Sequence, residues 1–112
     1  MSRAKTELFE RDLAAMASFS KALSHPVRIQ ILKILAEKDV CMCGEIVDLV
    51  PLAQSTVSQH LKELKEAGLI KGEVDGPKTC YCLDKMALES AMKSFSRVFS
   101  SICQCRIKGE SK

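Results

Sequence analysis

The chain has 112 residues, of which 46% are hydrophobic and 28% charged, and its formal net charge is +3. This length fits one domain, and the composition is that of a globular rather than a disordered protein. Aromatic residues make up only 4%, which disfavours all-β sandwiches and modules that stack single-stranded nucleic acid on aromatic rings. No run approaches the roughly 20 apolar residues of a membrane span, and charges throughout the first twelve positions leave no readable secretory signal. We therefore expect a cytoplasmic protein with one domain over residues 1–105 and a flexible tail over 106–112.

The N-terminal half predicts three helices. Apolar residues at steps of three and four predict an amphipathic helix over residues 5–22. Ser24 and Pro26 mark the start of a second helix over about 26–37, because proline is tolerated in a first turn. Residues 44–50 predict a short third helix. The second helix is apolar nearly all round, so we expect it to be the most buried; its apolar residues are Ile29, Ile31, Leu32, Ile34 and Leu35.

A fourth helix and a hairpin follow. Residues 69–74 and 78–83 predict two strands joined at Asp75-Gly76, a dipeptide typical of hairpin turns. Residues 54–67 predict a helix that Gly68 closes as a C-cap. Its apolar stripe recurs at i, i+4 and i+7 and consists of Val57, Leu61 and Leu64.

The last predicted helix covers about residues 84–103. The predicted order is four helices, two strands and a helix (ααααββα), which makes the fold class mainly α (α+β). A short helix, a turn and a second helix with a polar face form a helix-turn-helix, and the hairpin after it forms a wing. Apolar residues of the last helix recur at steps of four and three, as in a coiled-coil seam; they are Leu88, Met92, Phe95, Phe99 and Ile102.

The helix over residues 54–67 has a polar face opposite its apolar stripe. Its first two turns carry short hydrogen-bonding side chains that suit base edges in the major groove, and lysines on the wing suit phosphates. An ordinary solvated surface is the alternative, but Glu and Lys, both good helix formers, are absent from these two turns. His60 borders the stripe, so we expect it to be partly buried. The expected DNA-binding residues are Gln54, Ser55, Thr56, Ser58, Gln59, His60, Lys62, Lys71 and Lys78.

The cysteines are unusual in number and spacing. A reducing compartment makes them indicators of metal or redox chemistry rather than of a disulfide framework. Residues two apart in a strand lie roughly 6.5 Å apart at Cα and point the same way, which is near the limit for bridging. Each pair is therefore a poor self-disulfide but a reasonable pincer for a large soft ion. The six cysteines form three Cys-x-Cys pairs, Cys41/Cys43, Cys80/Cys82 and Cys103/Cys105.

Four segments of the chain resemble the ArsR/SmtB family of metal-responsive bacterial repressors. They are LSHPVRIQIL, CMCGEIVDLV, QSTVSQHLKELKEAGLI and GPKTCYCL, within about residues 20–84. The resemblance implies a homodimeric winged helix-turn-helix repressor that binds operator DNA and dimerises through its terminal helices. It also implies operator contacts from positions that match Gln54, Ser55, Ser58 and Gln59, whereas His60 belongs to the family's His-Leu signature.

The same resemblance implies an inducer. Cys41-Met42-Cys43 is similar to the Cys-x-Cys of the family's arsenic, antimony and cadmium/lead sensors. Arsenite repressors often have a third cysteine where this chain has Ile46, and As(III) prefers three sulfurs among its soft ligands. Cys103 or Cys105, from the same or the partner subunit, could supply the missing sulfur. The resemblance thus implies As(III) or Sb(III) as inducer, with Cd and Pb as further candidates, no organic cofactor, and Cys41, Cys43, Cys103 and Cys105 as metal ligands.

Cys80 and Cys82 are harder to assign. Tyr81 and Leu83 are expected to face the core, which turns the two cysteines to the opposite side of the strand. We expect them to be small buried or solvent-facing residues, and a second site shared with Cys103/Cys105 is the alternative.

Other functions stay open at this point. The cysteine pairs could form a redox or persulfide switch on the same DNA-binding fold. An enzyme is disfavoured because the sequence has no Cys-x-x-Cys, no glycine-rich phosphate loop and only two histidines. A winged helix used only for protein contacts is the remaining alternative.

Overall fold

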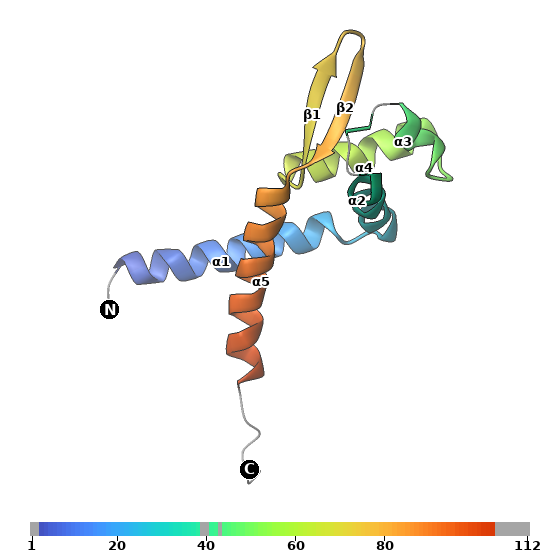
Figure 1. Ribbon diagram of the computed structural model, residues 1–112. Helices are drawn as coiled ribbons and strands as arrows, with labels where there is room; N and C mark the ends of the chain where they lie inside the picture. The colour runs from blue at the N-terminus through green and yellow to red at the C-terminus, as the bar shows by residue number, and fades with distance from the viewer. Residues whose placement is uncertain (1–2, 39–40, 43, 105–112) are drawn as a thin grey trace.

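The computed structural model describes residues 3–38, 41–42 and 44–104, and the elements follow the predicted order (Figure 1). The fold is the predicted mainly helical winged helix-turn-helix with a two-stranded wing. No helix in the described part of the chain is long and apolar enough to cross a membrane. The elements are α1 (Arg3–Ala22), α2 (Pro26–Lys38), α3 (Glu45–Asp48), α4 (Gln54–Glu66), β1 (Ile70–Asp75), β2 (Lys78–Leu83) and α5 (Lys85–Cys103).

The core lies where α2, α3, α4 and the base of the hairpin meet. The predicted stripe of α4 is confirmed, because Val57, Leu61 and Leu64 are at most 2% exposed. On α2 the prediction is only partly right: Ile31 and Leu35 are buried, but Ile29 is 44% exposed. Apolar residues all round a helix cannot all face a core that covers one side of it.

The wing is an antiparallel hairpin that projects from the core (Figure 1). Asp75 pairs with Lys78, so the loop is Gly76-Pro77, one residue later than predicted. Gly76 has a φ of 62°. A positive φ at the first loop residue is what type II′ hairpin turns require, and glycine adopts it without strain. Proline fits the second position, where no N–H is needed for the ladder.

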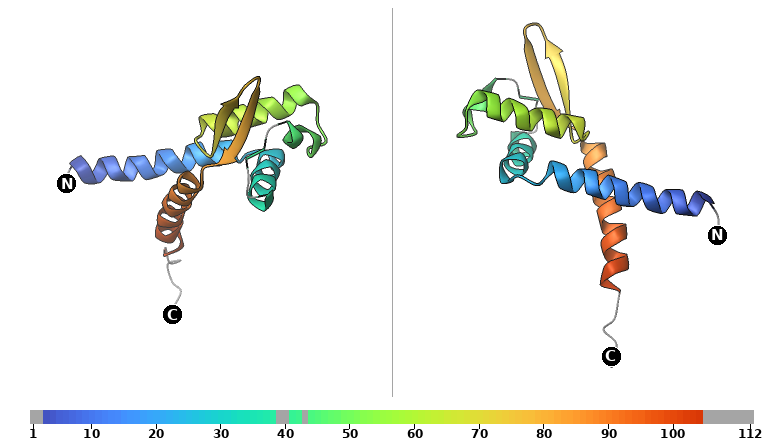
Figure 2. Two further views of the ribbon diagram at one scale, coloured as in Figure 1. Left: turned by 45° about the horizontal axis from the view of Figure 1, so that its top comes forward. Right: turned by 180° about the vertical axis from the view of Figure 1, so that it is seen from behind.

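The terminal helices pack against each other and extend away from the core (Figures 1 and 2). Phe19 of α1 meets Phe95 of α5 edge to face at 6.0 Å between ring centroids. Arg97 donates two 2.8 Å hydrogen bonds to Asp12, and Ser94 donates a third at 3.1 Å. The radius of gyration is 17.8 Å, well above the roughly 13 Å of a compact chain of about this length. The protomer is therefore an extended body with two projecting helices.

Candidate nucleic-acid interface and thiol pair

Helix α4 turns its polar side away from the core. Its N-cap residue Ala53 makes no side-chain cap hydrogen bond, so the first backbone N–H groups of α4 lack a capping side chain. The apolar stripe holds the opposite side against α2 and the hairpin, which fixes which residues point outward. The exposed residues of the first two turns are Gln54, Ser55, Thr56, Ser58 and Gln59, and Lys62 is exposed in the next turn.

The wing stands next to the start of α4. A hollow of about 240 Å³ separates the two elements, with Gln54 and Ser58 on one wall and Lys78 on the other. Lys71 is exposed on β1. Gln54 and Ser58, predicted from the helix, and Lys78, predicted from the hairpin, thus line one hollow. Their contact with DNA stays a prediction, but their placement suits a duplex that meets α4 and the wing together.

His60 points from α4 toward the start of α2. Its Nδ1 accepts a 3.1 Å hydrogen bond from Nε of Arg28. Arg28 is 9% exposed and also donates to the carbonyl oxygens of Lys21 and Ala22. The His25 ring lies 5.2 Å from the His60 ring, centroid to centroid. His60 is half-buried, as expected, and Arg28 is a partner that sequence reasoning missed.

The surroundings of His60 lower its pKa. Burial lowers the pKa of the imidazole below its ordinary value of 6.5, and the positive charges of Arg28 and His25 lower that pKa further. An uncharged ring is what the geometry needs, because a protonated Nδ1 could not accept from Arg28.

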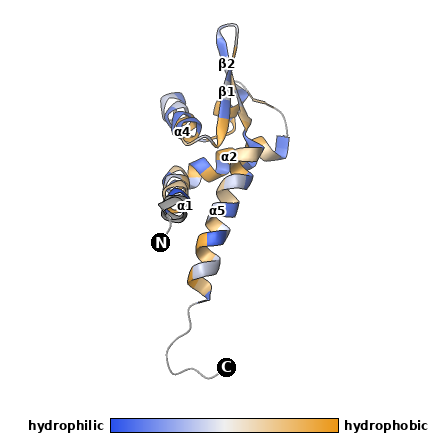
Figure 3. Cartoon of the chain, turned by 90° about the vertical axis from the view of Figure 1, so that its left-hand side faces the viewer, coloured by the Kyte–Doolittle hydropathy of each residue, from blue (hydrophilic) through white to orange (hydrophobic). Residues whose placement is uncertain are grey.

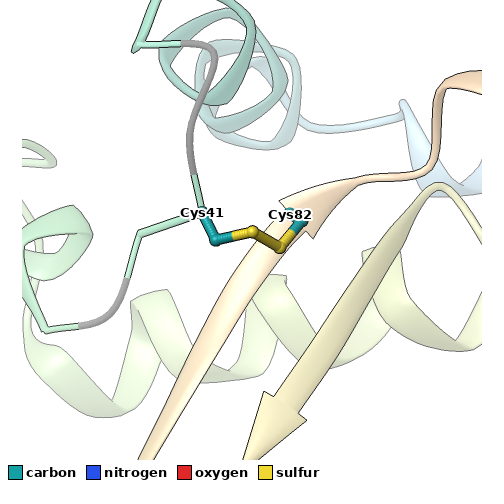
Figure 4. Close-up of a disulfide and its surroundings, with 2 residues drawn as sticks. All are labelled: Cys41 and Cys82. Carbon is teal, nitrogen blue, oxygen red and sulfur yellow. A yellow bond between two sulfur atoms is a disulfide. The ribbon is translucent and has the colours of Figure 1, made fainter. Parts of the chain in front are cut away.

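The segment before α3 pairs with the wing. Met42 and Tyr81 exchange two backbone hydrogen bonds, Met42 N–H to Tyr81 O at 2.9 Å and Tyr81 N–H to Met42 O at 2.7 Å. In an antiparallel pair the residues next to such an exchange lie directly opposite each other, with Cα atoms about 4.5 Å apart. Cys41 and Cys82 hold these positions, their Cα atoms are 4.4 Å apart, and they form a disulfide (Figure 4).

This pairing corrects the expectation for the wing cysteines. Tyr81 and Leu83 do pack against the core, as predicted. Cys82, however, is neither a solitary buried residue nor a solvent-facing one, because it is bonded to Cys41 across 41 positions of sequence. Cys80 is buried and is also disulfide-bonded. The signal that could have revealed the pairing was a second Cys-x-Cys in a strand, which matches the first in spacing.

The predicted metal ligands are not gathered within one protomer. Cys103 is a free, exposed thiol at the far end of α5, which leads away from the wing and α3 (Figure 1). Cys43 and Cys105 lie outside the described residues. Among the residues that the structure describes, no three His, Cys, Asp or Glu side chains cluster to hold a metal ion. The predicted ligand set stays a prediction.

The family model that matches the chain is a helix-turn-helix domain, over residues 23–73. The transcriptional regulator YgaV of Escherichia coli is 30% identical over 96 residues, which are 84% of this chain and 97% of YgaV. The repressor SmtB of Mycobacterium tuberculosis is 44% identical over 71 residues, 63% of this chain but only 52% of SmtB. The cadmium resistance regulator CadC of Listeria innocua is 29% identical over 94 residues, 83% of this chain and 78% of CadC.

A solved structure shares the fold. The homodimeric winged helix-turn-helix DNA-binding domain Mb0332 from Mycobacterium bovis has a TM-score of 0.62 and 26% identity. The match covers 100% of this chain and 96% of that one. The similarity therefore includes the terminal helices as well as the helix-turn-helix and the wing.

Proposed function

Because the chain belongs to the ArsR/SmtB family of transcriptional regulators, which are not enzymes, we propose that it is a cytoplasmic, dimeric repressor. It binds operator DNA through α4 and the wing. It leaves the operator when trivalent arsenic or antimony binds its cysteine thiolates. The observation that carries this proposal is the shared side of α4 and the wing, where Gln54, Ser58 and Lys78 line one hollow.

The polar face of α4 supports sequence-specific DNA binding. Glutamine can pair with both the donor and the acceptor of adenine, and one good bidentate pair contributes about 1–3 kcal/mol of discrimination. Gln54 and Gln59 are both exposed on the first two turns. Lys71 and Lys78 supply positive charge on the wing, which suits the phosphate backbone on either side of the groove.

The terminal helices support a homodimer. Met92, Phe99 and Ile102 of α5 are 65%, 40% and 56% exposed in the single chain. They belong to the predicted seam. Hydrophobic residues recur along the part of α5 that extends away from the core (Figure 3). A seam of this spacing is buried when a second helix packs against it. A second copy of the chain would cover it and would present two α4 helices to successive major grooves.

The release step follows from linkage. An inducer that binds the DNA-free form a few kcal/mol more tightly than the DNA-bound form shifts the equilibrium toward free protein. Thiolates are the ligand type that soft ions prefer, and Cys41 lies only four residues before α3, the first helix of the motif. An ion bound at Cys41 can change the packing of α3 and the wing against α4.

The test is binding of the reduced protein to a duplex from upstream of its own gene, followed by fluorescence anisotropy. Gln59→Ala should weaken binding roughly 5- to 150-fold, the equivalent of about 1–3 kcal/mol. Gln30→Ala is the matched control, because Gln30 is an exposed glutamine on α2. Arsenite should release the wild-type protein. Equal affinity of the two variants would contradict DNA readout by α4, and a complex unchanged by arsenite would contradict the inducer.

A second candidate signal is oxidation, and the Cys41–Cys82 disulfide favours it. Two thiols lose two electrons and two protons to form the bridge, and hydrogen peroxide, for instance, accepts them and becomes two waters. Peroxide would then release the operator from reduced protein in the absence of any metal ion. Arsenite would act without changing the number of disulfides, so the count of disulfides after each treatment distinguishes the two signals.

A further inference from the structure

A row of three residues crosses the wing and the segment before α3. Lys71 of β1 pairs directly with Cys82 of β2, and Cys82 faces Cys41 on its other side. Residues directly opposite each other in antiparallel strands point to the same face. Cys41 is exposed and Cys82 half-buried, so the face is accessible to a small solute once the bridge is reduced.

We propose that Cys82 is a ligand of the inducer together with Cys41, so that a thiophilic ion such as arsenite bridges the wing and the segment before α3 within one protomer. This proposal rests on the proposed function, because it gives the location of that function's inducer. It differs from the ligand set expected from sequence, in which the partners of Cys41 are Cys43, Cys103 and Cys105.

The backbone holds the two thiols in place without the disulfide. The Met42–Tyr81 hydrogen bonds fix the register, and they do not depend on the oxidation state of sulfur. Facing side chains of such a pair have Cβ atoms about 4.5–5.5 Å apart. Two thiolates can close this gap around an ion, taking zinc–sulfur bonds of about 2.3 Å as a guide. Cys103, at the far end of α5, has no comparable placement in the protomer (Figure 1).

The binding step needs no oxidant. Arsenous acid, As(OH)₃, reacts with two thiols; two As–O and two S–H bonds break, two As–S bonds form, and two waters leave. Arsenic stays trivalent and keeps one hydroxide. Lys71 stands across from Cys82 in the register. Because Lys71 is also a predicted phosphate contact, the ion would bind beside the surface that meets DNA.

The test maps which cysteines arsenite protects. Protein is reduced, freed of reductant under anaerobic conditions, treated with arsenite, and alkylated with iodoacetamide; peptide mass spectrometry then gives the labelling of each cysteine. Cys41 and Cys82 should be protected together. Cys82→Ser should bind arsenite at least tenfold more weakly, whereas Cys103→Ser and Thr79→Ser should bind it normally. Thr79 is the matched control, because it is an exposed residue on the same strand.

The outcomes separate this proposal from the proposed function. Unchanged arsenite affinity in Cys82→Ser, or full labelling of Cys82 while Cys41 is protected, would overturn the site. Loss of binding in Cys103→Ser alone would overturn it in favour of the end of α5. Protection of Cys41 and Cys82 without operator release would support the site and overturn arsenite as inducer. No protection of any cysteine would overturn both proposals.

Discussion

Arg28 of α2 forms a hydrogen bond with α4, the helix that is proposed to bind DNA. Its side chain is almost fully buried and donates three hydrogen bonds, to His60 Nδ1 on α4 and to the carbonyl oxygens of Lys21 and Ala22. Arg28→Lys keeps the charge but loses the planar fork that serves several acceptors at once. If the lysine replaces one of these bonds, two are lost, at about 0.5–1.5 kcal/mol each. The expected cost is about 1–3 kcal/mol of unfolding free energy.

Urea denaturation of the reduced protein at fixed protomer concentration measures this cost. Thermal unfolding should show a fall in Tm of roughly 4–12 °C, at about 4 °C per kcal/mol for a domain of this size. Arg11→Lys is the matched control, because Arg11 is exposed on α1. Operator affinity should fall with stability, since α4 loses a fixed contact. If Arg28→Lys unfolds within about 0.5 kcal/mol of the wild-type protein, the contact does not stabilise α4 and the reasoning is wrong.

Four further predictions follow from single contacts. The pKa of His60 is lowered in the folded protein, so the unfolded chain binds a proton at His60 more readily. The stability that neutral His60 contributes is therefore present above about pH 6.5 and is lost as pH falls toward the folded-state pKa. Urea midpoints between pH 5 and 8 should show this loss of stability, and His60→Gln should remove the pH dependence. Leu64→Ala, at a fully buried position, should cost about 2–5 kcal/mol, and a smaller loss in urea denaturation would argue against tight packing there. Asp84 caps α5 by accepting from the backbone N–H of Ala87, so Asp84→Ala should cost about 1 kcal/mol, with unchanged Tm as the contrary result. Phe99→Asp should convert the proposed dimer to monomer in light scattering, and an unchanged mass would exclude the α5 seam as the interface.

Local patterns were sufficient for the elements and for the exposed polar side of α4. The stripe of Val57, Leu61 and Leu64 has helical spacing, so the side of α4 that faces the core, and hence the side that faces outward, could be read from the sequence. Gly68, with a φ of 82°, follows the C-cap residue Ala67, so the glycine turn at the end of this helix was predicted to within one residue. The hairpin was also predicted, but its turn is one residue later, because Asp75-Gly76 and Gly76-Pro77 both suit a tight turn and only strand register decides between them.

The long-range contacts of Cys41 and His60 were decided by tertiary structure. Nothing near Cys41 in the sequence shows that Met42 pairs with Tyr81, and nothing near His60 shows that Arg28, 32 positions away, reaches it. Periodicity, caps and turns depend on neighbouring residues, so they leave a signal in the sequence. Pairing between distant segments depends on how the whole core closes, and for that reason the pairing of Cys41 with Cys82 depends on the wing lying beside the segment before α3.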